Sequence, residues 1–263
     1  AKLALNNSVP PILMASLRMF LVFIILIPFW RFRIPSKKFF KPLLIFSFSM
    51  GVLVYVFMNL SLYHSSIISP IILGSQLAIP FGILASAFIL KENISKNKWF
   101  LILASFFGIF IIFFDPKLNE NYLGLFFASL MALFFGLAQV YSRQLKELPT
   151  SMINASTGIF GFSLLLILSI LFEGNIYKNI EQININSWIL ISYQAVIVSL
   201  CAHLLMFYLY KFYTVGQIFP FYSLFPIFGI ILSYITFGEV PTLMFILGGI
   251  IVISSVFLLH KIK

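Results

Sequence analysis

One stretch of this chain occurs twice, at a constant offset of 147 residues: residues 81–92 have the sequence FGILASAFILKE and residues 228–239 have FGIILSYITFGE. The identical pairs are Phe81/Phe228, Gly82/Gly229, Ile83/Ile230, Ser86/Ser233 and Glu92/Glu239. Phe and Ile match often by chance in a chain this apolar, but Gly, Ser and Glu in one register do not. Because the period is about half the chain, the match predicts a duplicated domain and not a solenoid of short repeats.

The composition predicts an integral membrane protein built of helices. Hydrophobic residues make up 61% of the chain and charged residues only 9%, whereas a soluble domain carries roughly 25% charge. A membrane-spanning helix needs about 20 mostly apolar residues, and such runs follow one another here. The short alternating strands of a membrane β-barrel are absent from the sequence. The single cysteine, Cys201, excludes a disulfide framework and a thiolate metal site, and we expect it to be a buried apolar side chain.

Nine full spans are predicted, joined by short connections that leave no room for a soluble domain. Their ranges are 10–30, 41–63, 67–90, 97–114, 121–142, 151–172, 187–210, 216–237 and 241–260. The longest connection, residues 173–186, is polar and is predicted to be a loop. The sequence begins with Ala1 and not with Met, and its first residues resemble the end of a helix, so we expect most of a first helix to be missing before Ala1. A cleaved signal peptide is the alternative.

The positive charges give the predicted topology. One set of connections holds 13 Lys and Arg residues and the other holds three, Lys2, Lys117 and Lys178, while Arg18 lies inside a span. Since Lys and Arg mark the cytoplasmic side, the C-terminus is predicted to be cytoplasmic. The net charge of +10 is therefore a topology signal with some attraction to anionic lipid, and not a nucleic-acid patch.

This topology puts the matching residues Glu92 and Glu239 on opposite sides of the membrane. Two related halves with an odd number of spans must insert in opposite senses, which predicts an all-α, ten-helix (5+5) inverted repeat with its first helix largely missing. The predicted repeats are residues 1–114 and 121–260, joined by 115–120. Inverted repeats of this kind are shared by many transporters, whose substrate lies near the midplane where the halves meet.

Longer stretches resemble a known family. The segment NLSLYHSSIISPIILGSQLAIPFGILASAFILKENIS and its counterpart running from LLMFYLYKFYTVGQIFPFY to GGIIVISSVFLL are similar to the two EamA repeats of the drug/metabolite transporter (DMT) superfamily. The start, K-x-A-L-x(5)-P-P-x(5)-L-R, resembles the family's first two helices and places Arg18 on its recurrent arginine. The sequence GLFFASLMALFFGLAQVYSRQL resembles the opening helix of the second repeat. One departure is Lys91, where the family usually has glycine before the glutamate.

The resemblance implies a multi-pass transporter of the bacterial inner membrane, and its general look is similar to exporters of amino acids such as cysteine and O-acetylserine. We expect a small-molecule substrate, alternating access, no cofactor or metal, and a monomer that suffices, with a dimer possible. A transporter or exchanger of a nucleotide-like metabolite is the alternative. An intramembrane enzyme and a structural subunit are weaker alternatives, because the spans hold no catalytic set and a subunit needs no inverted duplication.

Polar residues at membrane depth are the candidate substrate-binding residues, since they are costly there unless they face a cavity or a neighbouring helix. Arg18 could bind an anion or carboxylate, and no acidic residue lies in the middle of a span to neutralise it. Amide side chains could hydrogen-bond a zwitterion or pack between helices, and His203 could titrate near neutral pH or be a core histidine. Under the 147-residue offset, Ser75 and Gln76 match Tyr222 and Ser223. The full set is Arg18, Asn59, Ser75, Gln76, Gln139, Gln194, His203, Tyr222 and Ser223.

Two further groups are candidates for movement. Glu92 and Glu239 lie at span ends and could gate the transporter or cap the start of the next helix. Pro70, Pro80, Pro220 and Pro226 remove backbone hydrogen bonds within spans, so they could be hinges or tolerated bends.

Overall fold

The computed structural model describes residues 1–29, 36–118, 121–202, 205 and 224–261, and this part of the chain is helical with no strands. The chain divides into two compact units. Unit 1 combines residues 1–63 with 137–208, and unit 2 combines residues 64–136 with 209–263. Each unit therefore takes one part from each predicted repeat.

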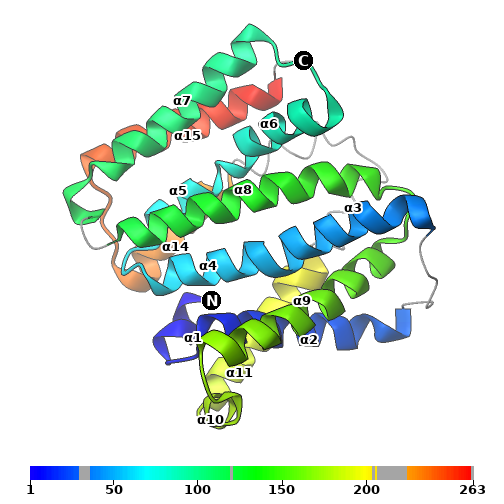
Figure 1. The fold of residues 1–263 in the computed structure, drawn as a ribbon. Helices are drawn as coiled ribbons and strands as arrows, with labels where there is room; N and C mark the ends of the chain where they lie inside the picture. Colours follow the sequence, from blue (N-terminus) through cyan, green and yellow to red (C-terminus); the bar gives the residue numbers. More distant parts are fainter. Residues whose placement is uncertain (30–35, 119–120, 203–204, 206–223, 262–263) are drawn as a thin grey trace. The chain divides into compact units, whose positions relative to one another are not determined.

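The helices alternate with short polar breaks (Figure 1). In chain order they are α1 (Lys2–Asn6), α2 (Pro11–Leu26), the 3₁₀ turn η1 (Ile27–Phe29), α3 (Lys37–Phe48), the π-helical η2 (Ser49–Leu53), α4 (Val54–Tyr63), α5 (Ser69–Ser75), α6 (Ala78–Leu90), α7 (Lys96–Phe113) and the 3₁₀ turn η3 (Pro116–Leu118). They continue with α8 (Tyr122–Gln144), α9 (Thr150–Phe172), α10 (Ile176–Glu181), α11 (Ile185–Tyr193), the π-helical η4 (Gln194–Ala202), α14 (Phe225–Phe237) and α15 (Leu243–Lys261).

The described helices are those of a membrane protein. Six are long and apolar enough to cross a bilayer, over Lys37–Tyr63, Ser69–Leu90, Lys96–Phe113, Tyr122–Gln144, Thr150–Phe172 and Ile185–Ala202. Three shorter apolar helices, Pro11–Leu26, Phe225–Phe237 and Leu243–Leu259, fall on further predicted spans. An all-α membrane fold is thus confirmed, although the predicted number of nine full spans is not. The predicted loop 173–186 contains the short helix α10 and the start of α11.

Unit 1 is built on α2 and α9, which lie side by side (Figure 1). Close approach is possible because small residues face each other: a Cβ on Gly161 of α9 would lie 2.6 Å from the carbonyl oxygen of Gly51 in η2. A Cβ on Gly158 would lie 3.2 Å from the backbone of Phe23 in α2. Glycines that let helix backbones approach are a common packing device in membranes.

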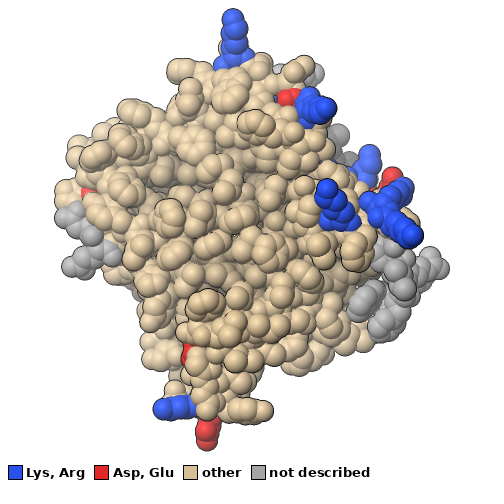
Figure 2. Space-filling view, viewed as in Figure 1, with Lys and Arg blue, Asp and Glu red and all other residues tan. Residues whose placement is uncertain are grey.

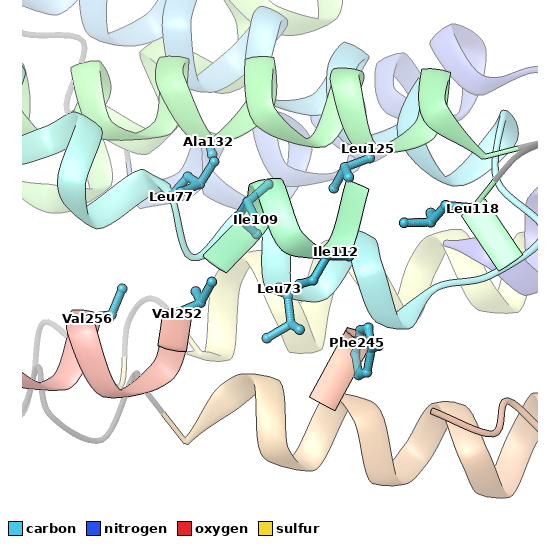
Figure 3. Packing of buried hydrophobic residues seen from close by; sticks show 10 residues of the cluster. All are labelled: Leu73, Leu77, Ile109, Ile112, Leu118, Leu125, Ala132, Phe245, Val252 and Val256. Atoms are coloured by element: carbon cyan, nitrogen blue, oxygen red, sulfur yellow. The ribbon is translucent and has the colours of Figure 1, made fainter. Parts of the chain in front are cut away.

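Unit 2 is built on α7 and α15, which also lie side by side (Figure 1). Here a Cβ on Gly248 would lie 2.5 Å from the carbonyl oxygen of Gly108. Buried apolar side chains form a core here (Figure 3), namely Leu73, Leu77, Ile109, Ile112, Leu118, Leu125, Ala132, Phe245, Val252 and Val256. Unit 2 therefore has its own apolar core.

Large apolar side chains also cover the outer surface of the helices. Along α7 and its C-cap residue they recur every three or four residues, at Phe100, Leu103, Phe107, Phe110 and Phe114, and each is more than half exposed. The face shown in Figure 2 is mostly uncharged. Exposed apolar patches of this extent are rare on soluble monomers, so lipid is the expected neighbour. Cys201, expected to be buried, is exposed on η4, which suits a small apolar side chain facing lipid.

Two glutamates hold helix N-termini that are distant in sequence. In unit 1, the Glu173 carboxylate accepts hydrogen bonds from the backbone N–H groups of Ile12 (2.6 Å) and Leu13 (2.8 Å), at the start of α2. Ser169 Oγ donates a third hydrogen bond to the same carboxylate (2.7 Å). Because Pro11 begins α2 and has no N–H, these two donors are the first free N–H groups of the helix.

In unit 2, Glu239 has the same role. Its carboxylate accepts hydrogen bonds from the N–H groups of Ile68 (2.6 Å) and Ser69 (2.9 Å) at the start of α5, and from Ser69 Oγ. A carboxylate satisfies orphan donors and favours the positive end of the helix dipole. Each bond set joins the end of a helix in the second predicted repeat to the start of a helix in the first.

The ends of α6 and α14 are related by the same offset of 147 residues. Lys91 ends α6 with φ 57°, and Gly238 ends α14 with φ 68°. Glycine adopts this left-handed conformation without the steric cost that other residues meet. The departure of Lys91 from the family pattern therefore places a strained residue where the second repeat has an unstrained one.

We expect Lys91→Gly to stabilise the protein and Gly238→Ala to destabilise it, each by about 1 kcal/mol, because a left-handed non-glycine residue costs roughly that much. No atom lies within 4 Å of a Cβ at Gly238, so only backbone strain changes there. Thermal unfolding in detergent measures both effects. A lower midpoint for Lys91→Gly would contradict the interpretation.

We expect Glu173→Gln and Glu239→Gln each to lower the free energy of unfolding by about 1–3 kcal/mol, because one oxygen that accepts an N–H becomes an NH₂ donor. Glu181→Gln, in the exposed last residue of α10, is the matched control and should change little. If all three variants unfold at the same temperature, the carboxylates do not anchor these helices.

Candidate functional site

A small cavity with a mainly apolar lining and a few polar groups lies inside unit 1, between spans from both predicted repeats. Its volume is about 30 Å³, enough for one or two waters or a carboxylate group, since one water needs about 10–15 Å³. The lining comes from α2, η2, α4, α9 and η4, with Met19, Val22, Met50, Tyr55, Asn154, Thr157, Gly158 and Ser199. None of these residues is acidic.

Both π-helical segments contribute to the cavity wall. Met50 lies in η2, Tyr55 lies two residues after the end of η2, and Ser199 lies in η4. A π-helical segment widens the helix locally and is often found at functional sites. Within η2, Gly51 packs against α9, which keeps the spans close on one side of the cavity.

Arg18 of α2 lies beside this cavity, behind the residues that line it, and is only 6% exposed. Its Nε donates a hydrogen bond to Ser199 Oγ at 2.8 Å, and its guanidinium carbon lies 4.5 Å from the centre of the Tyr55 ring. Both contacts orient the guanidinium, and the ring face attracts the cation. Both partners line the cavity, so Arg18 stands directly behind its surface.

In the described part of the chain, Arg18 has no carboxylate partner. The ion pair found there joins Lys38 and Glu147, at an exposed position of unit 1. The hydrogen bond from Lys38 and its positive charge hold the pKa of Glu147 below its usual value. Buried charges are normally paired, because an unpaired charge in a low-dielectric interior is costly. A buried arginine without such a partner is therefore unusual, and a bound anion would neutralise its charge.

Asn154 of α9 adds a second donor. Its Nδ2 atom is buried and has no hydrogen-bond partner among the described residues, and the residue lines the cavity. Thr157, one turn further along α9, has its hydroxyl within 3.1 Å of Ser47 Oγ. The cavity thus has an unused amide donor and three hydroxyl-bearing side chains, Tyr55, Thr157 and Ser199, with the Arg18 cation behind its lining.

Two other candidates in unit 1 bind backbone carbonyls. Asn59 is buried in α4, and its Nδ2 donates to the carbonyl oxygen of Pro11 (2.8 Å) while its Oδ1 lacks a partner. Gln194 is buried at the start of η4 and donates from Nε2 to Leu190, one turn back in its own helical run (3.3 Å). Neither lines the cavity.

In unit 2 the candidates lie around a break in the predicted span 67–90. Helix α5 ends at Ser75 and α6 begins at Ala78. The hydrogen bonds between them are short-range, from Gln76 N to Leu73 and from Leu77 N to Gly74. Pro80 explains the break, because its ring clashes with the carbonyl four residues back, which belongs to Gln76.

Ser75 Oγ donates to the carbonyl of Ile72 in its own turn, and the Gln76 side chain is buried at the break. Gln139 of α8 is half-buried. Pro70 and Pro226 both lie in the first turn of a helix, a position that tolerates proline. Neither of them therefore interrupts the middle of a described helix. His203, Pro220, Tyr222 and Ser223 lie outside the described residues.

Glu239 and Glu92 have different surroundings, and Glu239 does not cap the helix that follows it in the sequence. Glu239 holds the start of α5 and not that of α15, the next helix in the sequence. Glu92 is exposed in the break after α6, and the start of α7 is capped by Ser95, whose Oγ accepts from the N–H of Lys98.

A second cavity, of about 260 Å³, lies in unit 2 beside the Glu239 contact. Its polar groups already bind one another. Asp115 accepts hydrogen bonds from the Thr242 hydroxyl and from the N–H of Lys117 (3.0 Å), and Lys117 Nζ donates to the carbonyl of Val240 (3.2 Å). These contacts tie the end of α7 to the start of α15.

The sequence analysis missed Tyr55, Asn154, Thr157 and Ser199 as site residues. Asn154 and Thr157 are one turn apart near the start of a predicted span, so their spacing alone could have marked a polar helix face. Ser199 and Tyr55 carry no such pattern, because each matters only through its contact with Arg18 across the fold.

Comparisons with known proteins agree with this architecture. The model of the EamA-like transporter family matches residues 1–114 and 122–260. A solved structure described only as "Crystal structure of protein" superposes with a TM-score of 0.64 at 16% sequence identity, covering 97% of this chain and 89% of the other. That likeness concerns the fold alone. No curated protein sequence matches this one.

The family match covers nearly the whole chain, and the apolar helices described above fit a multi-pass membrane protein. The match places the chain within the DMT superfamily. Members of this family are transporters. This chain therefore belongs to the EamA-like transporter family.

Proposed function

We propose that this protein is a secondary transporter of small polar metabolites in the bacterial inner membrane, and that it exports amino acids by alternating access. The observation that carries the proposal is the cavity of unit 1, with the buried Arg18 behind its lining and without a carboxylate partner among the described residues. Ionisable residues within spans are rare and usually functional. A transported molecule with a carboxylate would supply the missing negative charge.

The origin of the wall residues supports a substrate site. Arg18 and Tyr55 belong to the first predicted repeat, whereas Asn154 and Ser199 belong to the second. In inverted-repeat transporters the substrate binds where the repeats meet. Because unit 1 already contains parts of both repeats, we propose that this cavity is one portion of the transport site.

The distribution of charge supports the proposed orientation. Connections that hold 13 Lys and Arg residues are placed in the cytoplasm, and the C-terminus lies there with them. The glutamates that hold α2 and α5 would then lie on the opposite, outer side. Opening of the transporter to that side would require these contacts to change or to move with the helices they join. A single chain contains both repeats, so we propose that a monomer suffices.

The test is transport by the full-length protein in proteoliposomes. We expect saturable uptake of at least one labelled amino acid from a panel of all twenty, reduced on the order of 10- to 100-fold by Arg18→Gln, because hydrogen bonds to charged groups contribute roughly 1.5–3 kcal/mol. Arg143→Gln, at an exposed position near the end of α8, is the matched control and should retain uptake.

A pH gradient applied in parallel tests proton coupling. Absence of uptake for every amino acid by a folded protein would contradict the amino-acid assignment. Uptake of a labelled nucleotide under the same conditions would favour the alternative substrate class.

A further inference from the structure

The cavity in unit 1 offers donors and positive charge but no acceptor with negative charge. Arg18 provides a guanidinium, Asn154 provides a buried, unpaired Nδ2, and no acid is among the residues that line the cavity. The neighbouring Arg18 cation would repel an ammonium group, although hydroxyl and amide oxygens could accept from it, whereas a carboxylate could accept from both donors.

The geometry of Arg18 suits this role. Its Nε is bound to Ser199 and its guanidinium lies over Tyr55, so two contacts fix the plane of the group. In the described part of the chain, no carboxylate forms an ion pair with the two terminal nitrogens of Arg18. Two parallel N–H donors at fixed spacing match the two oxygens of a carboxylate, which a lysine ammonium does not do.

The size of the cavity limits which part of a substrate can enter it. About 30 Å³ accommodates a carboxylate group but not a whole metabolite. A group that enters it would leave the rest of the molecule outside. Met19, Val22 and Met50 give the cavity a partly apolar lining, and a lower local dielectric strengthens the interaction of a bound carboxylate with the cation.

We propose that this cavity is a carboxylate subsite, and that the protein recognises its substrate by the carboxylate and not by the amino group. The inference rests on the proposed transport function and narrows it: the substrate class is small carboxylates, among which amino acids are one kind. Blocking the carboxylate abolishes recognition. Removing the amino group does not.

The test is binding, which does not depend on transport. The midpoint of thermal unfolding of the full chain in detergent is measured against increasing concentrations of four probes, L-alanine, propionate, L-alaninamide and ethylamine, with inorganic phosphate as a fifth. A ligand that binds the folded state raises the midpoint as its concentration exceeds its Kd. We expect L-alanine and propionate to stabilise the wild type, and L-alaninamide and ethylamine to have no effect.

Variants assign the effect to the cavity. Arg18→Gln should raise the apparent Kd for propionate on the order of 10- to 100-fold, Arg18→Lys should have an intermediate effect, and Arg143→Gln should not change it. Asn154→Leu removes the second donor at similar volume and should raise the same Kd on the order of tenfold. This variant keeps the test decisive if Arg18→Gln does not fold.

The proposal is overturned if L-alaninamide binds as well as L-alanine, if propionate binds none of the folded proteins, if phosphate binds more tightly than both carboxylates, or if both cavity variants retain wild-type affinity. Carboxylate binding without amino-acid transport would leave the subsite standing and reject the amino-acid exporter. The two proposals therefore fail separately.

Discussion

The fold depends on one constraint: in a membrane, every backbone donor that a helix leaves free must find its partner within the protein. Two glutamates meet this constraint at the starts of α2 and α5, each with two backbone N–H groups and a serine hydroxyl. The proline at each of these helix starts has no N–H to satisfy, so one carboxylate suffices for the donors that remain. These contacts also join the two predicted repeats within each unit.

Arg18 is the contrasting case. The glutamates that hold α2 and α5 are satisfied by backbone donors, and Asp115 is satisfied by Thr242 and by the N–H of Lys117. Arg18, by comparison, is held by neutral partners and lies behind the lining of a cavity that contains an unused amide donor. Among the described residues, a buried cation that has no carboxylate partner and lies beside a cavity calls for an explanation, and a negatively charged ligand is the simplest one. The same physical rule thus separates the groups that build the fold from the group that we assign to binding.

Much of the fold was predictable because it depends on short stretches of sequence. The apolar runs predicted the helices, and the 147-residue offset related the ends of α6 and α14 at Lys91 and Gly238. The partner of Glu239 was not predictable, because α5 begins 170 residues earlier in the chain and only tertiary packing brings the two together. The cavity was missed for a related reason. Arg18 stood out by its charge, but Ser199 and Asn154 belong to distant spans, and the π-helical segments η2 and η4 depart from the 3.6-residue period by which helix faces are recognised.

The most direct test of this account is an experimental structure of the full-length protein in lipid nanodiscs with propionate bound. The account predicts density for the carboxylate in the cavity of unit 1, within hydrogen-bond distance of the Arg18 guanidinium and of Asn154 Nδ2, with Glu173 still bound to the start of α2. Density for the ligand elsewhere, or an acidic side chain of the protein paired with Arg18, would show that this arginine holds the fold together and does not bind substrate.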